Sequence, residues 1–461
     1  MENDLINPDL RATKLALDRV SDTFCAAKWL QTTLHLHNGN TQSCHHVRAH
    51  AFDPAKVDLD PQALHNTPDK LRARARMLAG KRPRECSYCW AAEDRGRLSD
   101  RVLKSAGDWA RPHIEEAAAS GQGTAIAPRY VEVAFDSTCN FRCVYCSPAH
   151  STTWRKEIEQ FGAYPTSRGY NGLKKLEADG VLPVTQERRL KNIKAFWRWW
   201  PELGAKIQDF RVTGGEPFLA EETFTLLDWF AAHPRPDLNF AINSNMGVGA
   251  SRLGRAISGI RALHGRVRNF TLYTSLDSVG ARAEYIRFGL DFARFQANTE
   301  RVLNEVETPI TLSYMITVNA LSLSGLTELM GFILEQRQRH PRHGIALDTP
   351  YLQNPAHLSV GILTPDFISY LDRTLDFMKR HACADGRIGF YPSEIVKVDR
   401  IRDMLLKPRY PWLYREILRR DFAKMMDELD RRRRTSFPDT FPEYAEFRRR
   451  CSRALVGLNR S

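Results

Sequence analysis

Short apolar runs alternate with longer amphipathic segments between residues 128 and 352. Six of the short runs predict strands, because each is rich in β-branched or aromatic residues. They span 130–135, 207–213, 238–243, 269–275, 310–318 and 344–348. Segments between them, such as 221–232, 251–263 and 321–336, repeat apolar residues at helical spacing. Six successive βα repeats predict parallel strands joined by right-handed crossovers.

This pattern predicts an α/β fold. Because there are six repeats rather than eight, it favours a partial (β/α)6 TIM-like barrel over a closed one, although a doubly wound open sheet has the same signature. In either fold the chemistry belongs at the C-terminal ends of the strands. About seventy residues separate the first two strands, which predicts one or two extra helices there. Trp197, Trp199 and Trp200 are expected to pack in the core of such a helix rather than to stack on bases.

Two regions flank the predicted barrel. Residues 1–127 form an N-terminal accessory module that contains Cys and His, and residues 360–461 form a helical, basic C-terminal region. The barrel itself is expected over 128–359. Within the first region, the alternating stretch 34–41 predicts a hairpin that turns at Asn38-Gly39.

The net charge favours an anionic partner. Lys and Arg number 67 and Asp and Glu number 54, which leaves +13 and suits RNA, a nucleotide or an acidic peptide without choosing among them. The arginine runs 431–434 and 448–450 have acidic neighbours, so a solvated face or internal ion pairing is favoured over phosphate binding. No apolar run is long enough to span a membrane, and no secretory signal is visible, so we expect a cytoplasmic protein.

The nine cysteines are the strongest chemical signal. They occupy positions 25, 44, 86, 89, 139, 143, 146, 383 and 451. Their odd number in a large chain without an export signal argues against a disulfide framework, so close spacings indicate metal or redox sites. Cys139, Cys143 and Cys146 follow the first strand at a C-x₃-C-x₂-C spacing. Three thiolates are too few for a closed zinc site, but they can hold three irons of a four-iron cluster and leave the fourth open.

A second motif ends the next strand, where Gly214-Gly215-Glu216-Pro217 follows Thr213. Paired glycines let the backbone approach a ligand closely. Their carbonyls and the Glu216 carboxylate can accept hydrogen bonds from an ammonium group. An ordinary tight turn is the alternative, but the position at the adjacent strand end favours a ligand site.

Together these motifs resemble the radical SAM superfamily over about 225 residues. Its members carry C-x₃-C-x-aromatic-C after the first strand and Gly-Gly-Glu-Pro after the second. The resemblance implies a [4Fe–4S] cluster on the three cysteines, whose open iron chelates S-adenosyl-L-methionine. Residues 214–217 would hold the amino group of that cofactor, and Tyr145 would pack against its adenine. The implied chemistry is reductive cleavage to a 5′-deoxyadenosyl radical that abstracts hydrogen from a substrate, with electrons from a donor such as flavodoxin or ferredoxin.

The later strand ends continue the resemblance. Ser244 lies in Asn243-Ser244-Asn245 after the third strand, and Ser275 and Asp277 follow the fourth. The resemblance implies that Ser275 and Asp277 place polar groups on the ribose and that Arg287 pairs with the cofactor carboxylate. Asn319 is a weaker candidate. Ser244 and Arg287 could equally be satisfied loop residues.

A second cysteine group lies in the N-terminal region. Cys86 and Cys89 form a C-x₂-C motif, and Cys44 lies 42 residues earlier, at the end of the predicted hairpin. With a fourth ligand they predict a second metal site, either zinc or an auxiliary iron–sulfur cluster. The candidates for that ligand are His45, His46, Cys383 and Cys451, and our expected set contains His46. Alternatively, Cys44 is a core cysteine. This region and residues 437–443 resemble twitch-domain-containing radical SAM proteins, whose accessory-cluster cysteines ordinarily lie after the barrel.

We therefore expect a radical SAM enzyme, with a peptide or protein side chain as its first-ranked substrate by analogy with auxiliary-cluster relatives. RNA or a nucleotide-like small molecule ranks second because of the positive charge. A zinc-stabilised RNA-binding protein without catalysis is a hypothesis from another class. It explains Cys86 and Cys89 but gives no reason for the three-cysteine loop beside Gly-Gly-Glu-Pro.

Overall fold

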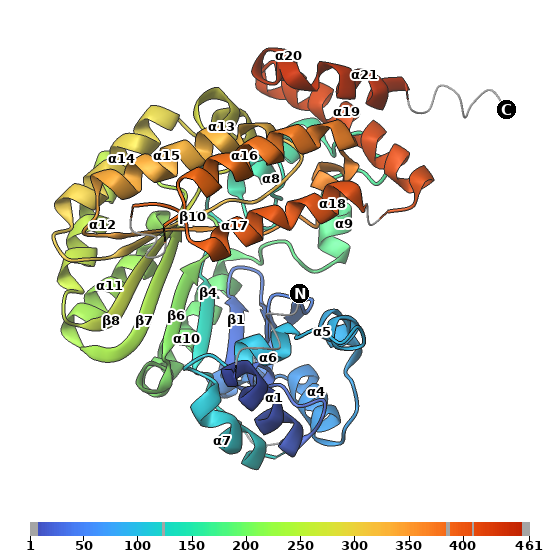
Figure 1. Ribbon diagram of the computed structural model, residues 1–461. Coiled ribbons are helices and arrows are strands. Elements are labelled where there is room, and N and C mark those ends of the chain that lie inside the picture. The colour runs from blue at the N-terminus through green and yellow to red at the C-terminus, as the bar shows by residue number, and fades with distance from the viewer. Residues whose placement is uncertain (1–7, 122–124, 384–387, 408–409, 454–461) are drawn as a thin grey trace. The chain divides into compact units, whose positions relative to one another are not determined.

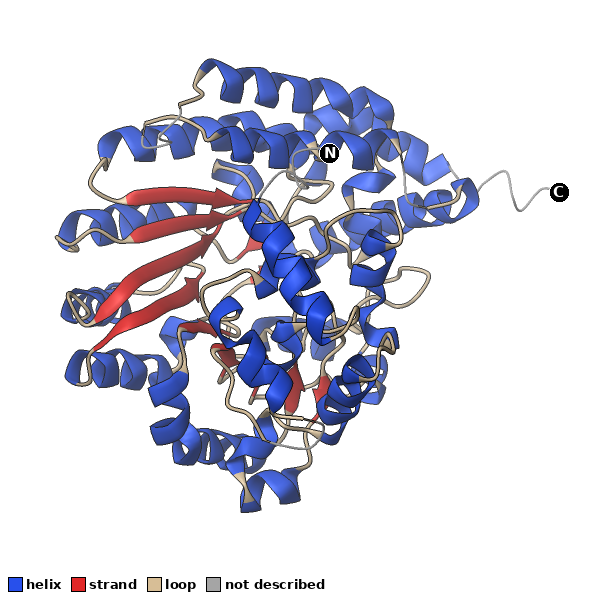
Figure 2. Ribbon diagram, turned by 60° about the horizontal axis from the view of Figure 1, so that its bottom comes forward, coloured by secondary structure: helices blue, strands red, loops and turns tan. Residues whose placement is uncertain are grey.

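The computed structural model describes residues 8–121, 125–383, 388–407 and 410–453. It is an α/β fold with a nine-stranded, mostly parallel sheet in the order β11-β10-β8-β7-β6-β4-β1-β2-β3 (Figures 1 and 2). The strands are β1 (Gln31–His35), β2 (Asn40–Gln42), β3 (His50–Ala51), β4 (Tyr130–Ala134), β6 (Asp209–Thr213), β7 (Arg235–Ser244), β8 (Val267–Ser275), β10 (Thr311–Met315) and β11 (Gly344–Asp348). A second sheet pairs β5 (Arg142–Cys143) with β9 (Arg287–Phe288).

All six strands expected from the sequence are present, as β4, β6, β7, β8, β10 and β11. From β4 to β11 the strand order follows the chain without reversal. This is the order of consecutive βα units, whereas a doubly wound sheet reverses at a switch point. The ladders β4–β6, β8–β10 and β10–β11 are parallel, as predicted.

The chain divides into two compact units, and the first contains the described residues of Met1–Ser137, Gly180–Pro217 and Arg235–Ala241. Its β1–β2 hairpin turns at Asn38-Gly39, and Gly39 has φ +75°, so the predicted hairpin is confirmed. However, β1 also pairs in parallel with β4. This division therefore differs from the one expected from the sequence, which placed a boundary at 127. Main-chain hydrogen bonds join that region to the strand at 130–134.

The helices of the first unit are α1 (Pro8–Val20), α2 (Ala26–Leu30), α3 (Pro54–Leu59), α4 (Pro68–Leu78), α5 (Ser87–Glu93), α6 (Asp100–Ser105), α7 (Ile114–Ala119) and α10 (Gln186–Lys206). The tryptophans of α10 pack as expected: Trp199 and Trp200 are buried, and Trp197 stacks on Phe135. A separate apolar cluster includes Trp29, Met77 and Trp90. It packs together the helices α1, α2, α4, α5, α6 and α7.

The second unit contains the described residues of Thr138–Asp179, Phe218–Pro234 and Ile242–Ser461. Its helices are α8 (Thr152–Phe161), α9 (Leu173–Ala178), α11 (Glu221–Ala232), α12 (Ala250–Ala262), α13 (Gly280–Ile286), α14 (Phe292–Glu305), α15 (Leu326–Arg339), α16 (Ile368–Arg380), α17 (Pro392–Asp399), α18 (Ile401–Leu406), α19 (Trp412–Arg433), α20 (Phe437–Thr440) and α21 (Ala445–Arg453). One or two extra helices were expected between the first two strands, and the structure has three helices there, α8, α9 and α10. The helices α15 and α16 lie side by side (Figure 1).

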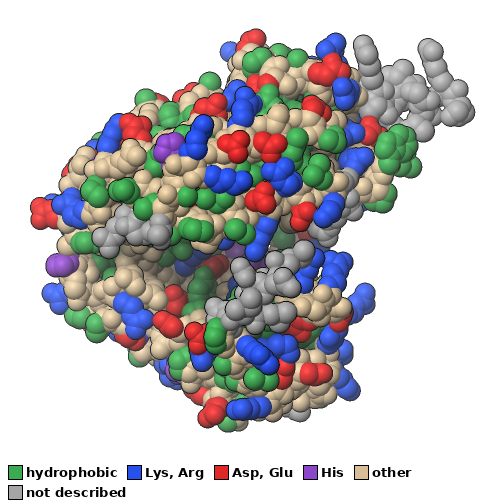
Figure 3. Space-filling view, viewed as in Figure 1, with side chains coloured by type: hydrophobic (Ala, Val, Ile, Leu, Met, Phe, Trp, Pro, Cys, Tyr) green, Lys and Arg blue, Asp and Glu red, His purple; other side chains and the backbone are tan. Residues whose placement is uncertain are grey.

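Arginines of the C-terminal runs form ion pairs within the protein. Arg431 and Arg432 both pair with Glu428, at 2.7 and 2.6 Å, and Arg433 lies 3.1 Å from buried Glu157. In Figure 3 acidic and basic side chains alternate over the C-terminal helices. This supports internal ion pairing over a phosphate-binding surface. Of the helices that the structure describes, none is sufficiently long and apolar to cross a membrane.

Candidate functional site

The loop that carries Cys139, Cys143 and Cys146 is held by strand pairing at its centre. In the β5–β9 ladder Cys143 lies opposite Arg287. The Val144 amide donates to the Ile286 carbonyl at 2.8 Å, and the Trp154 indole donates to the Cys143 carbonyl at 2.8 Å. These contacts fix the middle of the loop against a segment that is distant in sequence.

Side chains from α8 and from the loop before α9 fix the rest of the backbone. The Phe141 carbonyl accepts hydrogen bonds from the hydroxyls of Ser151 and Thr153, at 2.7 and 2.8 Å. The Cys146 carbonyl accepts from the Tyr170 hydroxyl at 2.7 Å and from Asn171 Nδ2 at 2.9 Å. The conformation of the cysteine loop is therefore set by side chains that touch its carbonyls.

Two glycines leave space for this loop. A Cβ on Gly247 would lie 2.3 Å from the ring of Phe141, and a Cβ on Gly289 would lie 2.8 Å from the Asn140 carbonyl. Gly289 also has φ +106°, which side chains rarely adopt. Phe141 is buried between these two positions, so both must be glycine.

Hydrogen-bond donors point at two of the three sulfurs. Cys139 Sγ accepts from the Phe141 amide at 3.4 Å and from Asn245 Nδ2 at 3.7 Å. Cys143 Sγ accepts from Arg287 Nη1 at 3.7 Å. Such donors stabilise thiolates and tune the potential of iron–sulfur clusters. Burial raises the pKa of the Cys143 thiol, and the Arg287 charge opposes that rise.

The carboxylate of Asp277 organises the charges beneath the loop. It is fully buried, and it accepts from the Tyr145 hydroxyl at 2.6 Å, from Arg287 Nη2 at 3.0 Å and from the Thr317 amide at 2.8 Å. Burial disfavours the Arg287 cation, but the charge of Asp277 outweighs it, so the pKa of Arg287 is raised. The ribose contact expected for Asp277 and the carboxylate contact expected for Arg287 stay predictions, and the structure adds the contacts that the two side chains make with each other. Both oxygens of Asp277 are occupied, and the two groups form an internal ion pair that orients Tyr145.

The other expected cofactor residues lie at strand ends. Ser244 is buried at the end of β7, where its hydroxyl accepts from the Met246 amide at 3.0 Å, and Ser275 ends β8 half-buried. In the first unit, Gly214 follows β6 with φ +134°, and a Cβ there would lie 2.7 Å from the Asp136 carbonyl. The Gly215 amide donates to that same carbonyl at 3.1 Å. Glu216 and Pro217 are buried, and Pro217 begins a short 3₁₀ helix, Pro217–Leu219.

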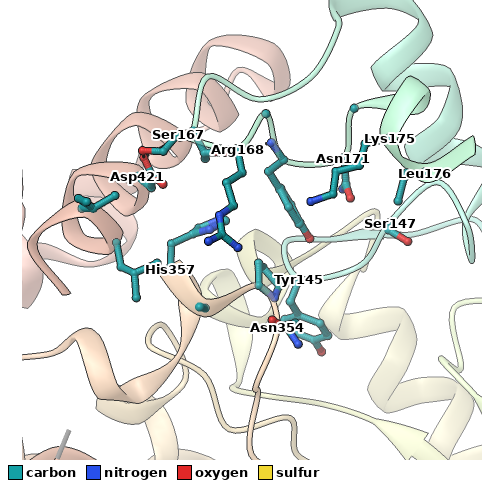
Figure 4. Close-up of a pocket in the computed structure, with 18 of the residues that line it drawn as sticks. Tyr145, Ser147, Ser167, Arg168, Asn171, Lys175, Leu176, Asn354, His357 and Asp421 are labelled. Carbon is teal, nitrogen blue, oxygen red and sulfur yellow. Dashed lines mark hydrogen bonds between the residues drawn. The ribbon is translucent and has the colours of Figure 1, made fainter. Parts of the chain in front are cut away.

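A cavity of about 420 Å³ opens beside the cysteine loop within the second unit. Tyr145 and Ser147 of the loop contribute to its wall, as do Arg168, Lys175 and His357 (Figure 4). Figure 4 shows the Arg168 side chain extending from its loop into the space between His357 and Tyr145. Its guanidinium lies 5.9 Å from the centre of the Tyr414 ring.

Two cations of this wall have no acidic partner. Within the described part of the chain, no carboxylate oxygen lies within 4.0 Å of Arg168 or Lys175, and both side chains are exposed. Asp421 also contributes to the wall, but it is buried and accepts from the Ser167 amide and hydroxyl at 2.9 and 2.8 Å. Asp179 is a further, exposed acidic residue of the wall, so the cavity carries charge of both signs, and Arg168 and Lys175 are the groups there that could bind an anion.

The second cysteine group comes together in the first unit. Cys44, Cys86 and Cys89 line one cavity, and Cys25 lines it with them. Burial first, and then the nearby Cys25 and Cys44 sulfurs, raise the pKa of the Cys86 thiol to about 12, while Lys28 opposes the rise. His46 also lines the cavity, but its Nε2 lies 2.6 Å from Asp100 Oδ2 and its ring stacks on Tyr88 at 3.8 Å.

Sequence reasoning missed Cys25, Arg168 and Lys175 as site residues. Cys25 belongs to no close cysteine spacing, and the two cations lie in a loop and a short helix without a motif. The only signal for Cys25 is its type, since an unpaired cysteine near a metal motif is a candidate ligand. For the cations no sequence signal exists.

Comparisons with known proteins give little. No protein-family model matches the chain, and no curated protein matches it. Among solved structures, the crystal structures of Streptococcus suis SuiB, alone and bound to S-adenosylmethionine, each align with a TM-score of 0.32 and 12% identity. The alignments cover 76% of this chain and 68% and 69% of theirs. A likeness this weak carries no argument, so the function of the chain is inferred from its residues and their geometry.

Proposed function

We propose that the chain is a radical SAM enzyme, built on a partial barrel of the six consecutive strands β4 to β11. The observation that carries the proposal is the cysteine loop: three half-buried thiols, a backbone fixed by flanking side chains, and donors pointed at two sulfurs. A structural zinc site would need a fourth ligand. The Gly214–Pro217 turn supports the proposal separately, because its glycine is imposed by a close backbone contact.

The donor set fits an iron–sulfur cluster. Zn–S bonds of about 2.3 Å in a tetrahedron place the sulfurs about 3.8 Å apart. Among the described residues, one group of three ligand atoms lies mutually within 4.8 Å, and it is His45, His46 and Asp100 rather than Cys139, Cys143 and Cys146. In a cubane cluster each cysteine binds a different iron, so its sulfurs are further apart than around one zinc ion.

When bound, a [4Fe–4S] cluster with S-adenosylmethionine supplies one-electron cleavage of the sulfonium and abstraction of a hydrogen atom from the substrate. The protein's residues bind and orient these groups. Cys139, Cys143 and Cys146 would hold the cluster, and Arg287 and Asn245 would stabilise its sulfur charge through their N–H groups. The Asp277–Arg287 pair keeps Tyr145 in one orientation at the cavity wall.

Formation of 5′-deoxyadenosine tests this activity. Anaerobically reconstituted protein, reduced with dithionite and given S-adenosylmethionine, should release 5′-deoxyadenosine in a chromatographic assay. Cys143→Ala should abolish release, and Cys383→Ala, which changes a cysteine outside both groups, should retain it. Reduced flavodoxin or ferredoxin should replace dithionite as the electron donor. A reconstituted wild-type protein that contains iron but leaves S-adenosylmethionine intact would refute the proposal.

The proposed substrate is an acidic side chain of a peptide or protein. Arg168 and Lys175 line the cavity that Tyr145 borders, and a guanidinium binds a carboxylate through two parallel N–H groups. The Tyr145, Tyr170 and Tyr414 rings on the same wall would contact the aliphatic part of the side chain. RNA is the second candidate, and the net charge of +13 is the observation that favours it.

Stimulation of 5′-deoxyadenosine release distinguishes the two candidate substrates. Peptides rich in Asp or Glu should stimulate 5′-deoxyadenosine release, and Arg168→Met should raise the peptide concentration needed while the unstimulated rate stays constant. Arg431→Met is the matched control, because Arg431 is exposed and paired with Glu428. Stimulation by short RNA but not by peptides would replace the first candidate with the second.

A further inference from the structure

The first unit brings four cysteines from three separate segments around one cavity. Cys25 precedes α2, Cys44 follows β2, and Cys86 and Cys89 lie at the start of α5. Cys89 is buried and the other three are half-buried. Four thiols line one cavity, where the close sequence spacings had grouped only three, and four is a complete ligand set.

Neither Cys25 nor Cys86 uses its thiol to cap the helix that follows it. Cys25 occupies the N-cap of α2, where a side chain usually accepts a hydrogen bond from the first helical amides, but its side chain makes no such bond. The Ser105 hydroxyl accepts from the Ala26 amide instead, at 3.2 Å. Cys86, at the N-cap of α5, also makes no capping bond. Neither sulfur is therefore committed to a helix cap.

The surroundings suit an anionic metal centre. Lys28 and Arg101 line the cavity and are almost fully buried. Lys28 is held by Glu85 at 3.2 Å, and Arg101 donates to the Phe24 carbonyl at 2.8 Å and pairs with Glu93. Four thiolates around a doubly charged metal core carry about two excess negative charges, which neighbouring cations offset. Ala27, Val47, Met77 and Trp90 line the same cavity and exclude water.

The spacing of the sulfurs bears on the choice between a zinc ion and an iron–sulfur cluster. A Cys₄ zinc site places its sulfurs about 3.8 Å apart. The four cysteines contain no trio of sulfurs mutually within 4.8 Å, although a group of three ligand atoms that does meet this limit is found among the described residues nearby, at His45, His46 and Asp100. A spacing wider than that around one zinc ion is compatible with a cubane, in which each thiolate binds a different iron.

We propose that Cys25, Cys44, Cys86 and Cys89 bind a [4Fe–4S] cluster with all four irons capped by thiolates. This site is independent of the one proposed for S-adenosylmethionine. Because no iron is open, the cluster cannot chelate a substrate, and its chemistry is one-electron transfer. His46 remains with Asp100 and is not a ligand.

The test uses full-length protein in which Cys139, Cys143 and Cys146 are all changed to Ala, so that only this site can hold iron. Reconstituted anaerobically, this variant should contain about four iron and four sulfide per chain and give an electron paramagnetic resonance signal after dithionite reduction. S-adenosylmethionine should leave that signal unchanged. About one zinc per chain without sulfide would overturn the proposal, and so would a signal that S-adenosylmethionine alters.

Ligand identity is tested in the same background. Cys25→Ala should remove most of the iron while the far-ultraviolet circular dichroism spectrum is retained, and His46→Ala and the matched control Cys383→Ala should keep it. Full iron content in the Cys25→Ala variant would overturn the assignment of Cys25. Should Cys25→Ala lose its fold, Cys25→Ser supplies the comparison, and the metal analysis of the background variant still decides between iron and zinc.

Discussion

Replacing Gly247 by alanine should disable the cysteine loop without touching a cysteine. The new Cβ would lie 2.3 Å from the Phe141 ring, and ordinary contact begins at 3.4 Å, so the ring must move by at least 3.4 − 2.3 = 1.1 Å. The Phe141 ring has no room to move aside. Its backbone is held by hydrogen bonds from Ser151 and Thr153 to its carbonyl, and Gly289 packs so closely on the ring that no space is left there. Overpacking of this kind costs about 1 to 3 kcal/mol.

The functional effect should exceed the loss of stability. Phe141 lies between Cys139 and Cys143, so its displacement moves two of the proposed cluster ligands, and a misplacement of about 1 Å can cost on the order of 100-fold in rate. The assay is 5′-deoxyadenosine release together with iron per chain. Gly254→Ala is the control, since its Cβ meets nothing within 4 Å and helix propensity should stabilise it by up to about 1 kcal/mol. Full iron and a wild-type rate in Gly247→Ala would refute the reasoning that the loop is rigid.

Three further changes test the same site and the C-terminal helices. Tyr145→Phe removes a 2.6 Å hydrogen bond to the buried Asp277 carboxylate and should lower the free energy of unfolding in urea by about 1.5 to 3 kcal/mol. Gly289→Ala, at φ +106° and against a loop carbonyl, should lower iron content as Gly247→Ala does. Hydrogen bonds from Arg431, partly opposed by burial, lower the pKa of Glu428 to about 2. Its stabilisation is therefore complete above its ordinary pKa of 4.5 and is lost as the pH falls toward 2, so Glu428→Gln should be less stable than wild type at pH 7, with a smaller difference at pH 3.5. An unchanged difference would contradict this pairing.

The parallel strands could be predicted from the sequence because each is a short apolar run between turn residues, a pattern that local chemistry determines. The pairing of β1 with β4 could not. Residues 34–41 read equally well as an isolated hairpin, and only the contact between segments separated by about a hundred residues shows that the hairpin extends the main sheet. Strand partners at such distances depend on the whole fold rather than on the pattern of either strand.

The site divides in the same way. Cysteine spacing identified two groups because ligands on one loop converge wherever that loop lies. Spacing could not reveal that Asp277 and Arg287 bind each other, since both residues match positions expected to touch a cofactor. The register of β5 against β9 places Arg287 opposite Cys143, and the buried carboxylate then becomes its nearest partner. Cys25 was missed for the same reason, because the fold rather than a motif brings it to Cys44.

The number of thiolates assigns different tasks to the two cysteine groups. In the proposed first centre three ligands would leave one metal corner for a small molecule, and the loop around Cys139, Cys143 and Cys146 borders a cavity with two cations that lack an acidic partner among the described residues. In the proposed second centre four ligands would leave no open metal corner. The walls around Cys25, Cys44, Cys86 and Cys89 carry buried cations and apolar side chains, and they lack a ligand-sized space with exposed charge. Such a centre cannot bind a substrate, and the positive charges of Lys28 and Arg101 offset its negative charge. It is therefore suited to accept and release electrons. Replacing Lys28 by methionine should accordingly lower the reduction potential of the second centre while leaving 5′-deoxyadenosine release with dithionite unchanged, because the chemical reductant reaches the first centre directly.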